Sequence, residues 1–113
     1  LVHAVRTSDE LTYRDEIQQI ASTHPGQFQM IPFVSREDTD FAIRGRVPAA
    51  IEDGRLEART GLTLDAAQSQ VMICGNPAMV RDTSAVLKER GMKKNLRRHP
   101  GHITTENYWK DNE

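Results

Sequence analysis

Apolar residues along the chain fall into short runs separated by segments of helical periodicity. Four runs predict buried or half-buried β-strands, over residues 1–5, 28–34, 71–74 and 102–107. Helical spacing and capping residues predict three helices in the intervals between these strands: one capped by Ser8 and ended by Pro25-Gly26, a short one over 47–53, and one over 77–90. This alternation predicts an α/β fold, with a parallel sheet flanked by helices on both faces.

Proline, glycine and charged residues mark the connections between these elements. Pro32 interrupts the second run, which indicates an edge strand or a local bulge. Gly91 is placed to end the last helix. The polar residues 35–44 predict a loop, and residues 55–69 predict an irregular connection with one helical turn near Asp65.

The junction between the third strand and its helix is the most informative local feature. The strand ends at Cys74-Gly75, Asn76 is a favoured N-cap residue, and Pro77 suits the first helical position. The N–H groups of a helix N-terminus lack helical partners and lie at the positive end of the helix dipole. A strand end of this kind therefore favours an anionic or polar ligand, although such turns are common in α/β proteins.

Length and composition narrow the class of protein. The chain has 113 residues, which predicts one domain, and its net charge of -1 gives no support for generic nucleic-acid binding. No apolar run reaches the roughly 20 residues that a membrane helix needs, and the pattern of the first residues leads us to expect no signal peptide. The single cysteine, Cys74, cannot form an internal disulfide, which favours a reducing, cytoplasmic location. Because the first strand begins at Leu1 without an initiator methionine, we expect the chain to be a fragment.

Three arginines follow predicted strand ends or precede a helix. Arg6 follows the first strand, Arg36 follows the second, and Arg46 precedes Pro48 at a helix start. Residues that follow parallel strands share one edge of a sheet, where ligands usually bind. Three guanidinium groups and the Ser35 hydroxyl at that edge would suit a phosphate monoester. Spacing alone also allows ordinary solvated loop arginines, which are more common.

Further motifs occur in a fixed order along the chain: His3-Ala4-Val5-Arg6, Val34-Ser35-Arg36-Glu37, Gly45-Arg46-Val47-Pro48, Val71-Met72-Ile73-Cys74-Gly75-Asn76-Pro77-Ala78-Met79-Val80-Arg81-Asp82, and Arg97-Arg98-His99-Pro100-Gly101-His102 with Glu106-Asn107-Tyr108-Trp109. In this order and over nearly the whole length, the chain resembles the C-terminal, NADP-binding domain of bacterial ferredoxin–NADP(H) reductases.

The resemblance implies a two-domain flavoenzyme. An N-terminal barrel holds FAD, and residues 1–113 form the NADP(H)-binding domain, a Rossmann-like parallel sheet flanked by helices that lacks its first βα unit. Hydride passes between NADPH and FAD, and the flavin exchanges single electrons with ferredoxin or flavodoxin. The family's Gly-Thr-Gly pyrophosphate loop and its flavin barrel are absent from this sequence. We therefore expect this chain alone to bind NADP weakly and to have no reductase activity.

The resemblance also implies positions for the NADP contacts. Four residues match the family's binders of the adenosine 2′-phosphate: Arg6, Ser35, Arg36 and Arg46. The turn beside the nucleotide corresponds to Gly75, Asn76, Pro77 and Ala78. Val5 is expected to contribute through its backbone or its packing. Asp82 matches a further NADP contact, and the alternative is that it is an exposed helix residue without a binding role.

Two residues are expected near the nicotinamide, and two aromatics near the flavin. Cys74 is expected to shape the site without acting as a nucleophile, although a small apolar strand residue is the more usual role. Glu106 resembles a carboxylate near the nicotinamide in plant-type relatives. Tyr108 and Trp109 match C-terminal aromatics that stack on FAD, and the alternative is that they fill a gap in the core.

A basic segment near the C-terminus suggests a partner surface. Acidic ferredoxins and flavodoxins would dock on it by electrostatic attraction, and a solvated face is the alternative. Its members are Lys93, Lys94, Arg97, Arg98 and His99. The four histidines have no metal-ligand spacing. Two other functions stay open: a non-catalytic nucleotide-binding or electron-carrier interaction module, and another flavin reductase of the same superfamily.

Overall fold

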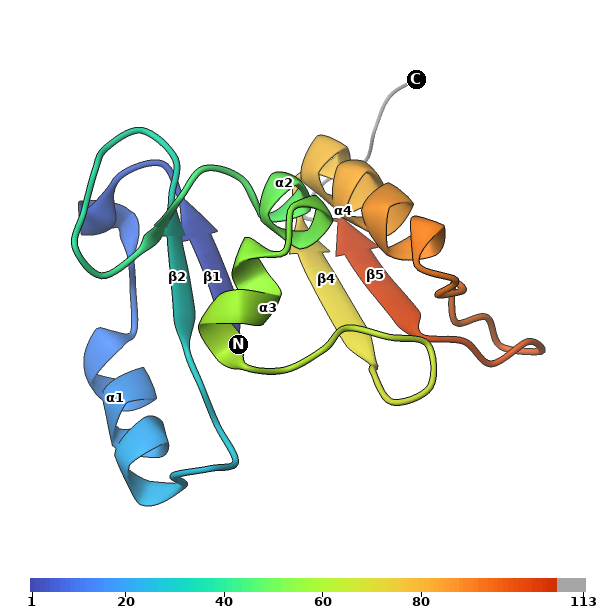
Figure 1. Ribbon diagram of the computed structural model, residues 1–113, viewed down its shortest axis with the longest axis horizontal. Helices are drawn as coiled ribbons and strands as arrows, with labels where there is room; N and C mark the ends of the chain where they lie inside the picture. Colours follow the sequence, from blue (N-terminus) through green and yellow to red (C-terminus); the bar gives the residue numbers. More distant parts are fainter. Residues whose placement is uncertain (108–113) are drawn as a thin grey trace. The chain divides into compact units, whose positions relative to one another are not determined.

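The computed structural model describes residues 1–107, which form two compact units (Figure 1). The first unit comprises Leu1–Gly61, and the second begins at Leu62. Each unit contains its own sheet, and all the strand pairs within the two sheets are parallel. The predicted α/β class, with parallel strands flanked by helices, is confirmed, but the described strands form two sheets where the pattern predicted one. Tyr108 and Trp109, the predicted FAD contacts, lie outside the described residues.

The first unit is built on a three-stranded sheet in the order β1-β2-β3. Its elements follow the chain in this order: β1 (Val2–Val5), the 3-10 helix η1 (Ser8–Glu10), α1 (Arg14–Thr23), β2 (Ile31–Val34), β3 (Ile43–Arg44), α2 (Val47–Glu52) and α3 (Arg55–Thr60). All four residues of β2 are buried because this strand lies between the other two. Phe33 and Val34 are fully enclosed and form the centre of this core.

Pro32 lies in the central strand, so the edge position that its sequence context predicted is wrong. The N–H groups of Ile31 and Ser35 donate to the carbonyls of Leu1 and Val5, so the backbone N–H and C=O groups of odd-numbered β2 residues point toward β1. The backbone of Pro32 therefore points toward β3, and that strand pairs only with Phe33 and Val34. Because the two residues of β3 do not extend to the position opposite the Pro32 nitrogen, the lack of an N–H there costs no hydrogen bond between the strands.

The first helix begins later than Ser8. Ser8 opens the 3-10 helix η1, and Tyr13 then adopts left-handed backbone angles (φ 57°) before α1 begins at Arg14. Thr7 and Glu10 favour a separate turn because Glu10 satisfies the Thr7 N–H. None of the α1 residues is buried, although Leu11 just before the helix is.

The sequence pattern missed two short elements of the first unit. Strand β3 lies within the predicted loop 35–44, and helix α3 lies within the predicted irregular connection 55–69. Helix α3 begins after Gly54 and ends before Gly61, both with left-handed backbone angles. Only Leu56 of this helix is buried, so the segment carries no apolar repeat from which a helix could be predicted.

The second unit pairs β4 (Val71–Gly75) with β5 (Ile103–Asn107), and α4 (Pro77–Glu89) packs on both strands (Figure 1). The hydrophobic core of this unit comes from both strands, the helix and the segment that follows it, and includes Ile73, Val80, Leu87, Met92 and Ile103. Burial along β4 alternates, and Met72 is 86% exposed. The prediction that this strand is buried therefore holds for only one of its faces, the face that carries Ile73.

Both ends of α4 follow the sequence signals. Asn76 accepts a hydrogen bond from the N–H of Met79 through its side chain (2.9 Å), and Pro77 occupies the first turn. At the other end, the N–H groups of Gly91 and Met92 donate to Lys88 and Leu87, with Gly91 at φ 82°. This pattern is a Schellman motif, in which glycine accommodates the left-handed turn.

Candidate functional site

The carboxyl ends of β1 and β2 bring three predicted site residues together. The strands pair in register up to Val5 and Val34, and the pairing continues beyond them. The N–H of Ser35 donates to the Val5 carbonyl (3.1 Å), and the N–H of Arg36 donates to the Arg6 carbonyl (2.9 Å). Arg6, Ser35 and Arg36 therefore lie side by side at this edge of the sheet.

Arg46 reaches the same edge through the next strand. Strand β3 pairs with β2 as far as Arg44, and the N–H of Gly45 donates to the Val34 carbonyl (3.2 Å). Gly45 has a positive φ of 113°, which L side chains rarely adopt, and it turns the chain into α2. Arg46 is the exposed N-cap of that helix. All four residues predicted to bind a phosphate thus follow the ends of adjacent parallel strands.

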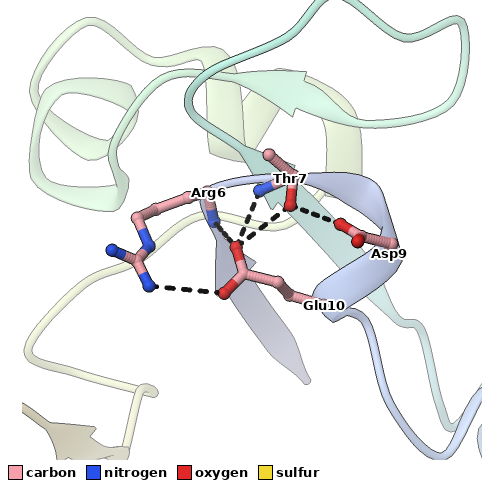
Figure 2. A network of polar contacts seen from close by, with 4 residues as sticks. All are labelled: Arg6, Thr7, Asp9 and Glu10. Carbon is pink, nitrogen blue, oxygen red and sulfur yellow. Dashed lines mark hydrogen bonds and ion pairs between the residues drawn. The ribbon is translucent and has the colours of Figure 1, made fainter.

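A single carboxylate organises the turn that carries Arg6 (Figure 2). Glu10 accepts the N–H groups of Arg6 (3.2 Å) and Thr7 (3.0 Å) on one oxygen, Oε1. Its other oxygen, Oε2, lies 3.5 Å from Nη2 of the Arg6 guanidinium. The Thr7 hydroxyl also donates to Glu10 and to Asp9. The backbone and the side chain of Arg6 are therefore held by the same residue.

A second carboxylate joins this turn to the loop after β2. Glu37 accepts a hydrogen bond from the N–H of Ser8 across 29 positions of the sequence. Further along the loop, Arg44 pairs with Asp38 (2.6 Å), and Arg55 donates to the Arg44 carbonyl (2.8 Å). The loop that carries Arg36 is thus connected both to the turn after β1 and to α3.

The hydrogen bonds keep both glutamates ionised. The pKa of Glu10 lies below its ordinary value, chiefly because the Thr7 N–H donates to the carboxylate. The pKa of Glu37 is also lowered, through hydrogen bonds from Ser8. These charges partly balance the arginines of the edge. The guanidinium groups of Arg36 and Arg46 extend the positive charge along it, where they can meet an anionic ligand.

In the second unit, the end of β4 collects the other predicted site residues. Gly75 ends the strand, and the N-cap Asn76 leads into Pro77 and Ala78 at the start of α4. Cys74 and Glu106 are paired across β4 and β5, and both are exposed. Cys74 is exposed, so it does not act as a small apolar residue of the core, which was the alternative role. Asp82 is also exposed, on the second turn of α4.

A groove of about 410 Å³ lies between α4 and β5. Three cationic side chains line it, and two of them come from α4: Arg81, Lys88 and Lys94. The buried hydroxyl of Ser84, which also lines it, has no hydrogen-bond partner. Lys94 belongs to the basic segment singled out in the sequence, and all five residues of that segment are exposed. Positive charge therefore extends from the groove to the segment before β5.

Two kinds of feature are missing from residues 1–107. Within these residues there is no group of three or more His, Cys, Asp or Glu side chains that could hold a metal ion. Within the same part of the chain, every helix is too short or too polar to cross a membrane.

Sequence reasoning did not single out Glu10 and Glu37 as parts of the site. For Glu10 a signal was available, because Thr7-Ser8-Asp9-Glu10 matches the capping-box pattern of a threonine followed three residues later by a glutamate. Glu37 had no local signal, since its partner Ser8 lies far away in the sequence. Only the parallel pairing of β1 and β2 brings the two loops together.

Comparison with known proteins gives the same overall assignment. Residues 1–85 match the family described as the oxidoreductase NAD-binding domain. A flavodoxin/ferredoxin–NADP reductase of Buchnera aphidicola is 46% identical over 110 residues, which are 96% of this chain and 43% of that protein. Its Escherichia coli counterpart is 47% identical, over 96% of this chain and 44% of that protein. The predicted resemblance is confirmed.

A solved structure supports the likeness in three dimensions. The ferredoxin NADP+ reductase of Neisseria gonorrhoeae, crystallised with bound FAD and NADP, superposes with a TM-score of 0.87 at 29% identity. The match covers 96% of this chain and 44% of that one, so the chain spans less than half the length of the relatives it matches. On the match over residues 1–85, the chain belongs to the family of oxidoreductase NAD-binding domains.

Proposed function

We propose that residues 1–113 are the NADP(H)-binding portion of a ferredoxin- or flavodoxin–NADP(+) reductase. The parent protein exchanges hydride between NADPH and FAD, and exchanges single electrons with ferredoxin or flavodoxin. Relatives that carry this name support the proposal over nearly the whole of this chain. The neighbouring crystal structure, with FAD and NADP bound, supports the choice of cofactors.

The edge formed by β1, β2 and β3 is the observation that carries the proposal. It gathers three arginines and a serine hydroxyl after the ends of adjacent strands: Arg6, Ser35, Arg36 and Arg46. A phosphate monoester is doubly charged and accepts paired N–H donors, which matches the planar fork of arginine. NADPH carries such a group on its adenosine ribose, whereas NADH carries a neutral hydroxyl there. We infer that this edge selects NADPH, with Val5 providing backbone support.

The end of β4 is proposed to face the rest of the nucleotide. The turn made of Gly75, Asn76, Pro77 and Ala78 lies at the positive end of the α4 dipole, which favours polar or anionic groups. Asp82 is proposed as a further contact from the next turn. When bound, the nicotinamide supplies the hydride. Cys74 and Glu106, adjacent across the two strands, are proposed to line the place where it reacts.

Replacing Arg36 tests the nucleotide specificity. In the FAD-loaded parent protein, Arg36→Ala should lower kcat/KM for NADPH by about tenfold or more, since hydrogen bonds to charged groups are strong. The value for NADH should change little. Arg14→Ala is the matched control, because Arg14 is exposed and its guanidinium lies over the Phe41 ring, 5.7 Å from the centroid. Equal losses with both nucleotides would contradict the assignment of this edge to the 2′-phosphate.

The partners of the parent protein are part of the same proposal. We propose an FAD-binding domain in the same protein, with Tyr108 and Trp109 stacking on the flavin. Ferredoxin or flavodoxin, both acidic, would dock on positive charge such as that of the basic segment 93–99 and the groove beside it. The single cysteine supports a cytoplasmic location. A salt-insensitive KM for the carrier would contradict the electrostatic docking.

A further inference from the structure

Glu10 contacts Arg6 at two separate points, once at the backbone and once at the side chain. Through Oε1 it accepts the Arg6 N–H, and through Oε2 it faces the guanidinium of the same residue. Figure 2 shows one terminal nitrogen of the Arg6 guanidinium directed toward this carboxylate and the other terminal nitrogen directed away from it. The backbone and the head group of Arg6 are therefore fixed relative to each other.

This double contact leaves the guanidinium able to bind a second anion. The ion pair with Glu10 is made through Nη2, so the other terminal nitrogen, Nη1, keeps its donors for another partner. An exposed arginine side chain otherwise samples many rotamers, and ordering it on binding costs conformational entropy. A side chain already held in place avoids much of that cost. Arg6 is 64% exposed, so water screens the repulsion between Glu10 and an incoming phosphate.

The turn that carries Glu10 is itself anchored to the loop of Arg36. Glu37, the next residue after Arg36, accepts the N–H of Ser8, the first residue of η1. The Arg36 N–H also donates to the Arg6 carbonyl. A change at Glu10 therefore acts on a turn that stays attached to the loop after β2 at two other points, and its effect is concentrated on Arg6.

We propose that Glu10 is a positioning residue for nucleotide specificity, which sets Arg6 in the orientation that binds the 2′-phosphate. The inference rests on the proposed function, because it presupposes that Arg6 contacts that phosphate. It goes further by assigning a specificity-determining action to a carboxylate that does not itself contact the ligand. Removal of this carboxylate should weaken binding of the phosphate, although it removes a negative charge from the site.

Calorimetric titration of the parent protein with 2′,5′-ADP tests the proposal without depending on turnover. Glu10→Ala should raise the Kd for 2′,5′-ADP about three- to tenfold and leave the Kd for 5′-AMP unchanged. Glu10→Gln should recover part of the loss, because its amide oxygen still accepts the N–H groups of Arg6 and Thr7. Glu16→Ala, which removes an exposed carboxylate from α1, is the matched control and should change neither constant. In steady-state assays, KM for NADPH should rise while kcat stays constant.

A double-mutant cycle separates positioning from general loss of structure. If Glu10 acts through Arg6, adding Glu10→Ala to Arg6→Ala should have no further effect on the Kd. An unchanged or lowered Kd for 2′,5′-ADP in Glu10→Ala alone would overturn the proposal, and a lowered value would mean that Glu10 competes with the phosphate. Where Arg6→Ala weakens 2′,5′-ADP and Glu10→Ala does not, only this inference fails. Where Arg6→Ala itself has no effect, the phosphate site of the proposed function fails with it.

Discussion

Carboxylates in this chain fix the loops that carry the arginines. Glu10 holds the turn after β1, and Glu37 connects that turn to the loop after β2. Both accept backbone N–H groups in their ionised form, and hydrogen bonding lowers the pKa of each. At the scale of single residues, the geometry of the phosphate edge therefore depends on negative charges that do not bind phosphate.

Acid should loosen this turn. A carboxylate with a lowered pKa in the folded state stabilises the fold fully above its unfolded pKa, about 4.3 for glutamate. That contribution is lost as the pH falls through the lower, folded pKa, because the unfolded state then binds more protons. Amide exchange at Thr7 and Ser8, corrected for intrinsic rates, should show less protection below that range than at neutral pH.

Glu37→Gln provides the comparison for this pH effect. The variant keeps an acceptor oxygen for Ser8 but has no charge to titrate, so protection at Ser8 should vary less with pH than in the unmodified protein. Equal pH dependence in the two proteins would contradict an origin in Glu37.

Helix α4 is specified by its two ends. Asn76 caps the first turn, and the Schellman motif at Gly91 closes the last. At the scale of elements, these local signals place the helix against both strands of the second sheet. The same N-terminal turn is the one proposed to face the nucleotide, so stability and binding share residues there.

Asn76→Ala should destabilise the parent protein by about 1 kcal/mol, since the Met79 N–H loses its side-chain acceptor. Urea unfolding followed by far-UV circular dichroism measures the change. Asn76→Asp keeps a capping oxygen at the helix N-terminus and should restore most of the loss. An aspartate variant as unstable as the alanine variant would argue against capping as the cause.

Gly101 is required by close packing of backbone before β5. A Cβ at this position would lie 2.5 Å from the Lys94 carbonyl oxygen and 2.6 Å from that of Lys93. The Lys93 carbonyl also accepts the N–H groups of His102 (2.7 Å) and Ile103 (3.0 Å). Any added side chain must therefore move backbone that is already hydrogen-bonded to the start of β5.

Gly101→Ala should cost about 1–3 kcal/mol in the same unfolding assay, as expected for overpacking. Gly26→Ala is a useful comparison, because Gly26 has a positive φ of 83° but no atom within 4 Å of an added Cβ. Its cost should be limited to backbone strain of about 1–2 kcal/mol. Loss of His102 and Ile103 amide protection only in Gly101→Ala would identify close contact as the cause.

At the scale of the whole molecule, the chain spans about 44% of the length of the relatives it matches. This fraction decides which activity the chain alone is expected to have. The proposed reaction needs FAD, which we propose is held by a separate domain of the parent protein. The 113-residue chain alone should therefore oxidise no NADPH. Mixing it with a separately produced flavin domain of the parent should restore NADPH-dependent flavin reduction, followed as bleaching of flavin absorbance.

Mixing the chain with the flavin domain also distinguishes a reductase from a non-catalytic nucleotide-binding module. Activity in the mixture that disappears with Arg36→Ala would support the enzyme assignment. A folded chain that binds NADP but never supports flavin reduction would favour a non-catalytic nucleotide-binding module. The intact mass of the purified protein is the first control, since a value near 12.8 kDa identifies the chain without its flavin domain.

Much of the fold was predictable because its signals are local. The ends of α4 depend on Asn76, Pro77 and Gly91, and each acts within one turn of its own position. Strands β1 and β4 start or end within a residue of the prediction. The predictions failed for Pro32, β3 and α3. Pro32 and β3 depend on which strand lies alongside and how far it reaches, which a short polar segment does not encode. Helix α3 buries only Leu56 and so carries no apolar repeat.

The sequence by itself determined the alternation of strands and helices, the caps, and the set of arginines that could bind a phosphate. Periodicity and capping are properties of neighbouring residues, and the family resemblance rests on the order of motifs. Only the tertiary structure decided that Arg6 and Arg36 are joined by a backbone hydrogen bond, and that Glu37 reaches Ser8 across the two loops. Parallel pairing of β1 and β2 is the physical reason, because it fixes the register of residues about 30 positions apart.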